Sequence, residues 1–407
     1  MDNMITIDEA FEHYKRALRP LAEEIVSLSI AQGRVLSQDV ESAIDLPPFP
    51  QSAMDGYAFR AADTADASSD RPARLKLAGE VPASGLEDVP SIQPGQAVRI
   101  FTGGYVPDGA DAVLRQEDAR VEGDRLLVSE PVVAGQDHRR QGEEIRAGDT
   151  VVEAGTRLSF RHVATLANCG VAEVSVYRAP CVAAFTTGDE VIESGQPLRP
   201  GQVYDANTPL MLGWLRAEGL STVMTKTLPD TLAGTEAALH EAFEQANVVV
   251  TTGGVSVGDY DFVIPAAENI GMAPVFWKVR QKPGKPLFFS VMDGKALLGL
   301  PGNPGSAFAC LMTHGRRVLD LLQGMASPRP HFGMGKLAEP IPMGNREWWA
   351  RCRVTYSANG EAWLEVLPRQ ASHMIANLGE TECLARIPIG ERVLERGHPV
   401  LWTSLDP

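Results

Sequence analysis

Carboxylates stand where loops begin along this 407-residue chain, and their placement limits the chemistry that they can do. The positions are Asp55, Glu144, Glu190, Asp230 and Asp261. An isolated acidic residue is usually a solvated surface group, but several together offer the oxygen ligands of a hard cation such as Mg²⁺. The eight histidines show no HxxxH or HExxH spacing, and no cysteine lies in a CxxC. A zinc site is therefore not expected.

Three glycine-rich loops follow short apolar runs, and a pair of lysines lies between the last two. The loops are residues 186–190, 251–258 and 300–306, and the lysines are Lys282 and Lys285 on a Pro-Gly turn. A buried strand that ends in glycines builds the ligand crevice of an open parallel sheet, because glycine lets the backbone approach a ligand. We therefore expect an anion site, with Gly253, Gly254 and Ser256 around a phosphate or pyrophosphate.

The loop at residues 251–258 lacks two well-known nucleotide-binding patterns. It has neither the Gly-Lys-Ser/Thr of a P-loop nor the GxGxxG of a dinucleotide fold. A P-loop ATPase or a nicotinamide-dependent dehydrogenase therefore has no support in the sequence.

Composition excludes further classes of protein. The 52 acidic residues exceed the 37 basic ones by 15, which argues against sequence-independent binding of nucleic acid. No apolar run reaches 18 residues, so no membrane span is expected. The amphipathic N-terminus is unlike a secretory signal, and the five cysteines are isolated and odd in number. We therefore expect a cytoplasmic protein.

Changes in pattern along the chain predict four structural units. Residues 5–36 read as helices, residues 51–140 as short strands, and residues 181–324 as alternating strands and helices. Within the last segment a helix near 208–219 is expected, capped by Asn207 or Thr208. The predicted units are residues 1–45 with 141–180 (a helical and mixed N-terminal domain), 46–140 (an inserted β domain), 181–328 (α/β) and 329–407 (a C-terminal β domain).

The alternation of strands and helices in residues 181–328 predicts the fold class of the core. Strands separated by helices are typical of a doubly wound α/β domain, in which parallel strands place their loops at one edge. The whole chain is therefore expected to be a multidomain α/β plus β protein.

Six motifs, which together span most of the chain, resemble those of one family. They are SAMDGYAFR (52–60), IFTGGYVPDGADAV (100–113), TTGDE (186–190), TTGGVSVGDYDF (251–262), KPGKPLFF (282–289) and LPGNPGSAF (300–308). In this order they resemble the molybdopterin molybdenumtransferase (MoeA) family. Residues 181–324 alone are also similar to molybdopterin adenylyltransferases and to some nicotinamide-nucleotide amidases.

The resemblance implies the last step of molybdenum cofactor synthesis. Molybdate would be the metal-bearing substrate, adenylated molybdopterin would receive the metal, and AMP would leave with the help of Mg²⁺. The dithiolene sulfurs would belong to the substrate, so no set of cysteine ligands is required. The resemblance also implies a homodimer and a possible contact with the adenylyltransferase of the same pathway.

The family's site residues carry over to matching positions of this sequence. Those implied as catalytic are Asp55, Glu190, Asp261, Lys282 and Lys285; those implied as substrate-binding are Thr102, Asp230, Pro301, Pro304, Arg351 and Ser372; those implied as metal ligands are Asp55, Glu144, Glu190 and Asp261. Arg351 is a weaker match, because its neighbours diverge. At Glu144 this chain departs from the family's frequent GED, which lengthens the carboxylate side chain by one methylene.

Two alternative functions compete with this interpretation. The α/β core alone would suit an adenylyltransferase or a nicotinamide-nucleotide amidase, but residues 51–140 and 331–407 match the molybdenumtransferase layout instead. A scaffold that binds receptor peptides, as the gephyrin E domain does, would share the whole architecture. The chain starts directly at the helical segment, without a preceding adenylyltransferase-type domain, which makes the scaffold the weaker expectation.

Overall fold

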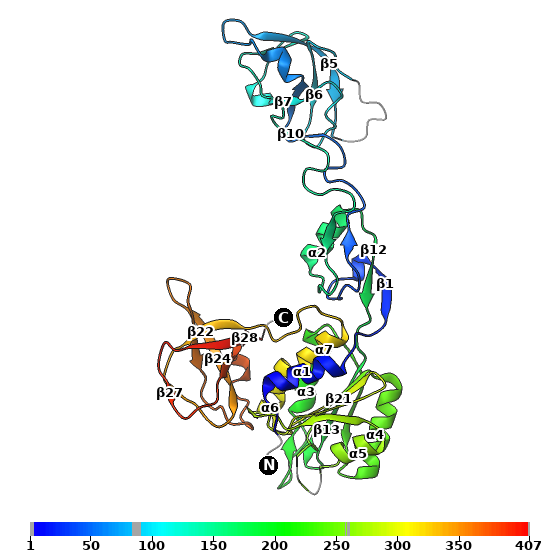
Figure 1. Cartoon of the computed structure of the whole chain (residues 1–407), viewed down its shortest axis with the longest axis vertical. Helices are drawn as coiled ribbons and strands as arrows, with labels where there is room; N and C mark the ends of the chain where they lie inside the picture. Colours follow the sequence, from blue (N-terminus) through cyan, green and yellow to red (C-terminus); the bar gives the residue numbers. More distant parts are fainter. Residues whose placement is uncertain (1–3, 84–90, 257, 259–260, 406–407) are drawn as a thin grey trace.

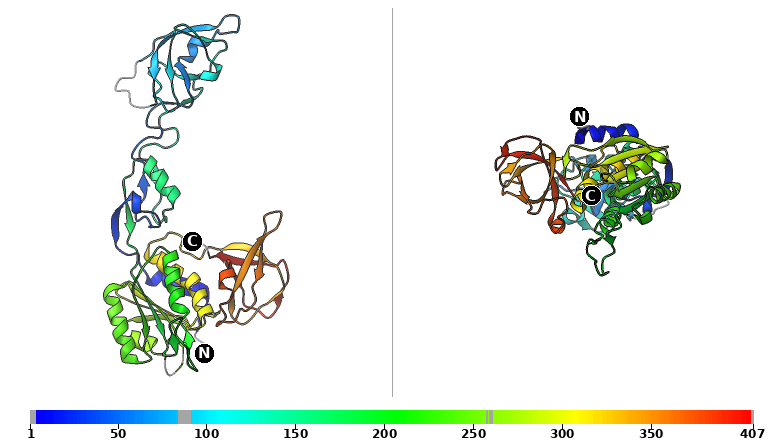
Figure 2. Two further views of the ribbon diagram at one scale, coloured as in Figure 1. Left: turned by 180° about the vertical axis from the view of Figure 1, so that it is seen from behind. Right: turned by 90° about the horizontal axis from the view of Figure 1, so that it is seen from below.

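The molecule is elongated, and a narrow neck separates one domain at one end from two domains at the other (Figure 1). The computed structural model describes residues 4–83, 91–256, 258 and 261–405. A β domain lies at one end, and an α/β domain with a small β barrel beside it lies at the other. The view from behind shows the same separation (Figure 2). In the part of the chain described here, no helix is long and apolar enough to cross a membrane.

A six-stranded sheet forms the centre of the α/β domain, in the order β16-β13-β17-β21-β20-β18. Neighbouring strands are parallel from β16 to β21, whereas β20 runs antiparallel to both of its neighbours. This arrangement confirms the prediction of a doubly wound domain. The strands are β13 (Val182–Thr187), β16 (Thr222–Leu228), β17 (Val248–Thr252), β18 (Ala273–Trp277), β20 (Phe288–Met292) and β21 (Lys295–Leu300).

Helices cover both faces of this sheet because its strands are apolar on both sides. Val182 and Ala184 of β13 pack into one core cluster, and Ala183 and Phe185 pack into the other. The helices are α3 (Asn207–Ala217), α4 (Leu232–Gln245), α5 (Val263–Asn269), α6 (Pro304–Cys310) and α7 (Arg316–Leu322), with a π-helical turn (Leu311–Gly315) between the last two.

The N-terminal helix α1 (Ile7–Ala17) packs on the α/β domain. Thr6 and Glu9 form a capping box at its start, and Ile7, Phe11 and Tyr14 enter a core of that domain. The sequence had grouped these residues with residues 141–180 instead. The expected helical stretch 5–36 is also wrong beyond residue 18, because Pro20 cannot continue the helix and a strand follows.

The neck is a small unit made of two distant parts of the chain, residues 23–46 and 145–177. Its strand β1 (Glu23–Ser27) pairs with β12 (Glu173–Tyr177), and β2 (Val40–Glu41) pairs with β11 (Thr150–Val152). Ser159 caps α2 (Phe160–Asn168) at the residue where the sequence predicted a helix to begin. The neck has its own core around Leu36, Leu158 and Leu166.

The β domain beyond the neck, here called the distal β domain, comprises residues 51–139. Its sheet has the order β7-β4-β6-β5-β9-β8 around a core that includes Phe59, Ile100 and Leu126. The strands of this sheet are β4 (Gly56–Phe59), β5 (Ala73–Val81), β6 (Gln96–Ile100), β7 (Ala112–Arg115), β8 (Arg120–Glu122) and β9 (Arg125–Val128). Two further strands, β3 (Gln51–Ser52) and β10 (His138–Arg139), pair with each other outside it.

The C-terminal segment forms a closed β barrel beside the α/β domain. The ring closes because β24 pairs with both β25 and β26, while β28 joins β22 to β26. Its strands are β22 (Gly333–Leu337), β23 (Ile341–Pro342), β24 (Glu347–Tyr356), β25 (Ala362–Val366), β26 (Cys383–Ile387), β27 (Val393–Leu394) and β28 (Pro399–Ser404). From the α/β side, β19 (Gln281–Lys282) pairs with β24.

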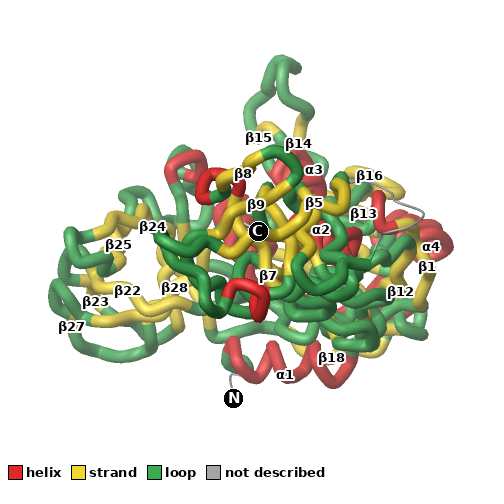
Figure 3. The backbone as a smooth tube through the Cα atoms, turned by 90° about the horizontal axis from the view of Figure 1, so that it is seen from above, coloured by secondary structure: helices red, strands yellow, loops and turns green. Residues whose placement is uncertain are grey.

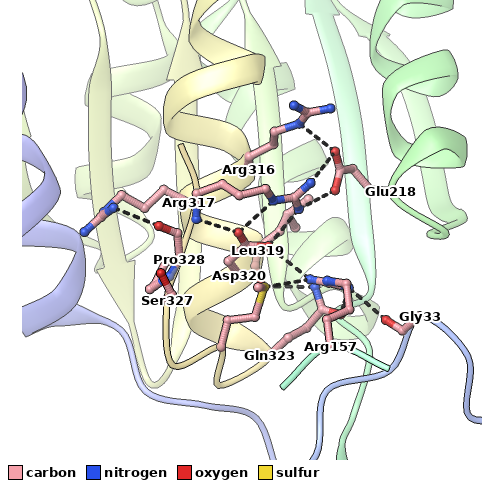
Figure 4. Close-up of polar contacts among 12 residues, drawn as sticks. Gly33, Arg157, Glu218, Arg316, Arg317, Leu319, Asp320, Gln323, Ser327 and Pro328 are labelled. Atoms are coloured by element: carbon pink, nitrogen blue, oxygen red, sulfur yellow. Dashed lines mark hydrogen bonds and ion pairs between the residues drawn. The ribbon is translucent and has the colours of Figure 1, made fainter. Parts of the chain in front are cut away.

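A buried ionic cluster joins the neck, the α/β domain and the strap that leads to the barrel (Figure 4). Asp320 of α7 is fully buried and pairs with Arg157 of the neck (3.0 Å) and with Arg329 of the strap (2.8 Å). Glu218, just after α3, pairs with Arg316 and Arg329 at 2.8 and 2.5 Å. The cluster therefore fixes how three parts of the chain meet.

Candidate active site

A polar cavity of about 730 Å³ lies at the edge of the α/β sheet where the parallel strands end. The loops after β13, β17 and β21 contribute to its lining, as the rule for open parallel sheets requires. The residues that line it are Thr186, Thr187, Gly188, Glu190, Val191, Val203, Tyr204, Asp205, Ala206, Asn207, Asp230, Gly253, Gly254, Gly258, Asp261, Gly302, Asn303, Pro304 and His373.

Two glycines of the loop after β17 leave no room for a side chain. A Cβ on Gly253 would lie 2.2 Å from Oγ1 of Thr187, and one on Gly254 would lie 2.6 Å from Cγ2 of Val263. Both glycines also have positive φ angles, +88° and +69°. The loop can therefore pass close to the neighbouring strand end only because these positions are glycine. Ser256 is exposed on the same loop, whereas Val257, Asp259 and Tyr260 lie outside the described residues.

Three of the predicted carboxylates meet in this cavity, namely Glu190, Asp230 and Asp261. Asp230 accepts a hydrogen bond from the backbone N–H of Asp189 (3.2 Å), and Asp261 accepts one from that of Gly258 (2.6 Å). In the described residues no ion pair neutralises any of the three, and no group of three or more His, Cys, Asp or Glu is arranged as a finished metal site.

The proline loop after β21 forms another side of the cavity. Pro304 is in the first turn of α6, and Pro301 is buried behind the loop. The Asn207 side chain donates to the carbonyl of Gly302 (2.8 Å), which ties the loop to the start of α3. Asn303 donates to the hydroxyl of Ser372 (3.1 Å), so Ser372 lies directly beside this loop.

Arg351 of the barrel is buried and holds the segment that carries Ser372. Its guanidinium donates to the carbonyls of Met374 (2.5 Å) and Arg369 (2.6 Å). Burial lowers the pKa of Arg351. Arg351 and Ser372 are therefore brought together at the barrel side of the cavity, and His373 reaches its lining.

The predicted lysines are not among the residues that line the cavity. Lys282 is exposed on β19 and lies over the ring of Trp348, with Nζ 5.0 Å from its centre, and Lys285 is half-buried three residues later. The turn between them is held by the fully buried Gln281, whose side chain donates to the carbonyl of Gly284 (3.1 Å). Gln281 in turn contacts Nε2 of His314 at 2.9 Å.

Asp55, Thr102 and Glu144 lie far from the cavity within one chain. Asp55 and Thr102 belong to the distal β domain, at the other end of the elongated molecule (Figure 1). One oxygen of Asp55 accepts from both the backbone N–H and the hydroxyl of Thr102, each at 2.8 Å. These bonds hold the pKa of Asp55 below its usual value. Glu144 is exposed near the end of the neck.

The polar and aromatic residues of the cavity lining that the sequence reasoning missed include Tyr204, Asp205, Asn207 and His373. Asp205 accepts from the backbone N–H groups of Asn207 and Thr208 (2.9 Å each), so it caps α3 in place of the predicted Asn207 or Thr208. An aspartate two residues before the first helical residue was the signal available for it. Tyr204 and His373 carry no comparable local pattern.

Three family models match the chain and together account for most of it. They are the MoeA N-terminal region, domains I and II (residues 5–170), a probable molybdopterin-binding domain (183–320) and the MoeA C-terminal region, domain IV (334–405). Proteins named molybdopterin molybdenumtransferase are 34% identical in a Nostoc species, over 94% of this chain and 88% of theirs, and 35% identical in Haemophilus influenzae, over 93% of each.

A solved structure agrees with the whole arrangement. The molybdopterin biosynthesis moeA protein of Pyrococcus horikoshii superimposes with a TM-score of 0.83 at 28% identity, over 99% of this chain and 100% of that one. The likeness extends over every domain and is not confined to the α/β core.

Proposed function

Since this chain belongs to the molybdopterin molybdenumtransferase (MoeA) family, we propose that its cavity binds adenylated molybdopterin, takes molybdenum from molybdate and releases AMP. The chain is a transferase that inserts molybdenum during molybdenum cofactor biosynthesis. The observation that carries the finer proposal is the cavity itself, where glycine loops lie beside three carboxylates that no ion pair among the described residues neutralises.

An acidic cavity suits an anionic substrate only if a cation accompanies that substrate. Glu190, Asp230 and Asp261 supply oxygen ligands, which Mg²⁺ prefers, and Mg²⁺ is commonly held by one or two carboxylates together with substrate phosphates. A bound Mg²⁺ would neutralise charge on the phosphoanhydride.

We assign the following roles to the residues in and around the cavity. Gly253 and Gly254 would let the loop backbone approach the phosphates, and Asp261, which lines the same cavity, would orient a water against the phosphoanhydride. Water would add to the phosphorus of the molybdopterin phosphate, and the bond from that phosphorus to the bridging oxygen would break. AMP would leave with the bridging oxygen, and the proton of the water would pass to a carboxylate. We assign molybdate, a tetrahedral dianion, to Lys282, Lys285 and Ser372, which lie outside the cavity lining on the barrel side. Arg351 would hold the segment that carries Ser372.

Asp55, Thr102 and Glu144 enter this proposal through a second copy of the chain. Within one chain they lie at the far end from the cavity (Figure 1). In a homodimer the distal β domain of one chain would face the cavity of the other, and Asp55 would complete the carboxylate set. A contact with the pathway's adenylyltransferase would serve the transfer of the substrate. A cytoplasmic location stays a prediction from the sequence.

Incubation of the purified protein with adenylated molybdopterin, molybdate and Mg²⁺ tests this function. We expect AMP to appear, as measured by chromatography, together with a cofactor that activates a molybdenum-free apoenzyme. Cleavage of nicotinamide mononucleotide without release of AMP would instead support the amidase alternative. For binding, we expect adenylated molybdopterin to raise the melting temperature of the protein and nicotinamide mononucleotide to leave it unchanged.

A further inference from the structure

A short arm borders the cavity, and it carries an aromatic ring that no step above uses. Strands β14 (Val191–Ile192) and β15 (Val203–Tyr204) pair in parallel at its base. The loop between them stands clear of the α/β domain in the view from above (Figure 3). Tyr204 is the last residue of β15 and lines the cavity, although 47% of its surface is exposed.

The position of Tyr204 is fixed from both sides. Its backbone neighbours are tied to β14 by hydrogen bonds from Val203 N–H to the Glu190 carbonyl (2.9 Å) and from Asp205 N–H to the Ile192 carbonyl (2.8 Å). The Tyr204 hydroxyl donates to the carbonyl of Gln196 in the arm (2.9 Å). The backbone on either side of Tyr204 and its hydroxyl are thus both held by hydrogen bonds, while its ring stays partly exposed. A ring held in this way can stack against a ligand without first losing conformational freedom.

Tyr204 differs in character from the other residues around the cavity. Most of these are Thr, Gly, Asp, Glu or Asn, and among the described residues that line the cavity only Tyr204 and His373 carry an aromatic ring. A flat ring beside glycine loops and carboxylates is the arrangement that binds a nucleotide, because a phosphate takes the glycines and a heteroaromatic ring stacks on the aromatic side chain.

We propose that Tyr204 is a stacking residue for a planar heteroaromatic ring of the substrate. The inference rests on the proposed function, in which the substrate carries two such rings, an adenine and a pterin. Both rings share the chemistry that Tyr204 recognises, so the test must separate them. Stacking of one base on an aromatic side chain contributes about 5- to 150-fold in affinity.

The experiment compares ligands with and without a ring on matched variants. Affinities of the whole protein for AMP, for ribose 5-phosphate and for neopterin, a soluble pterin, are measured by calorimetry in the presence of Mg²⁺. The variants are Tyr204→Ala, Tyr204→Phe and the control Tyr356→Ala, an exposed tyrosine of the barrel. Thermal unfolding confirms that each variant is folded.

We expect Tyr204→Ala to weaken binding of AMP or of neopterin by at least about 5-fold and to leave ribose 5-phosphate unchanged. The ligand that responds identifies the ring. Tyr204→Phe should bind that ligand within about 3-fold of the wild type, since it keeps the ring and loses only the hydroxyl anchor. Tyr356→Ala should change nothing.

Three results would overturn the inference. They are unchanged affinities for both ringed ligands in Tyr204→Ala, a parallel loss for ribose 5-phosphate, and a wild-type protein that binds AMP no better than ribose 5-phosphate and does not bind neopterin. Failure of the wild type to bind any of these ligands, combined with no release of AMP from adenylated molybdopterin, would refute the proposed function itself.

Discussion

The two ends of this molecule present carboxylates in opposite ways. At the α/β end, Glu190, Asp230 and Asp261 surround a cavity of about 730 Å³ and enter no ion pair among the described residues. At the distal end, Asp55 stands on a sheet, and Thr102 satisfies one of its oxygens with two hydrogen bonds. The first arrangement leaves room for a ligand and a cation. The second fixes a single charge on a surface, where it can act only on something brought to it.

The largest effect is expected between the two ends, at the buried ionic cluster that sets their relative placement. Asp320→Ala leaves Arg157 and Arg329 without their common partner, and breaking a buried pair costs about 3–5 kcal/mol. Urea unfolding measures the loss in the free energy of unfolding. The control Glu122→Ala removes two exposed ion pairs, with Arg120 and Arg74, and should change that free energy by less than about 1 kcal/mol. Similar values for the two variants would show that the cluster does not hold the domains.

A large effect on activity, without one on stability, is expected at the cavity end. Asp261→Asn keeps the shape of the side chain and removes its charge, so release of AMP should slow by about 100-fold or more. The free energy of unfolding should change by less than about 1 kcal/mol, because no ion pair of Asp261 occurs among the described residues. Glu268→Gln, on the exposed side of α5, is the matched control. A wild-type rate in Asp261→Asn, with unchanged dependence on Mg²⁺, would remove Asp261 from the mechanism.

Acid should weaken the α/β end through a buried histidine. Burial lowers the pKa of His314 to about 3, against 6.5 when it is unperturbed. A depressed pKa contributes stability above pH 6.5, and this stability is lost as the pH falls from 6.5 towards 3, by at most about 1.4 kcal/mol per pH unit. Unfolding of His314→Gln between pH 7 and 4 should show a shallower slope than that of the wild type. Equal slopes would mean that His314 is not the group that titrates.

The smallest effect is expected at the distal end. Thr102→Val removes the hydroxyl and keeps the backbone donor, so the pKa of Asp55 should rise part of the way towards its usual value of 3.8. The charge of Asp55 is present above that usual value and is lost as the pH falls through the lowered pKa. NMR titration of the Asp55 carboxyl carbon measures the shift. An unchanged midpoint would show that the hydroxyl bond does not stabilise the ionised form.

The sequence predicted the cavity end well because its signals are local. Glycines and carboxylates after apolar runs place Glu190, Asp230 and Asp261 at one sheet edge, since parallel strands end on the same side. The turn that carries Lys282 and Lys285 lies outside the cavity lining, because β19 pairs with β24 of the barrel. No local sequence pattern predicts this pairing. The periodicity of α1 shows that one face is buried but does not show against which domain. Tyr204 depends on the arm, and its strands of two residues each are too short to recognise.

The central claim is that two copies of the chain build each site. Because Asp55 and the cavity lie at opposite ends of one chain, variants at the two ends test this claim most directly. We would mix purified Asp55→Ala and Asp261→Asn proteins under conditions that exchange subunits, and measure release of AMP from adenylated molybdopterin. Each variant alone should be inactive. A heterodimer has one intact site, so an equal mixture should recover about a quarter of the wild-type rate. A mixture that stays as inactive as its components would contradict the account. So would a wild-type protein that light scattering shows to be a monomer and that releases AMP at its full rate.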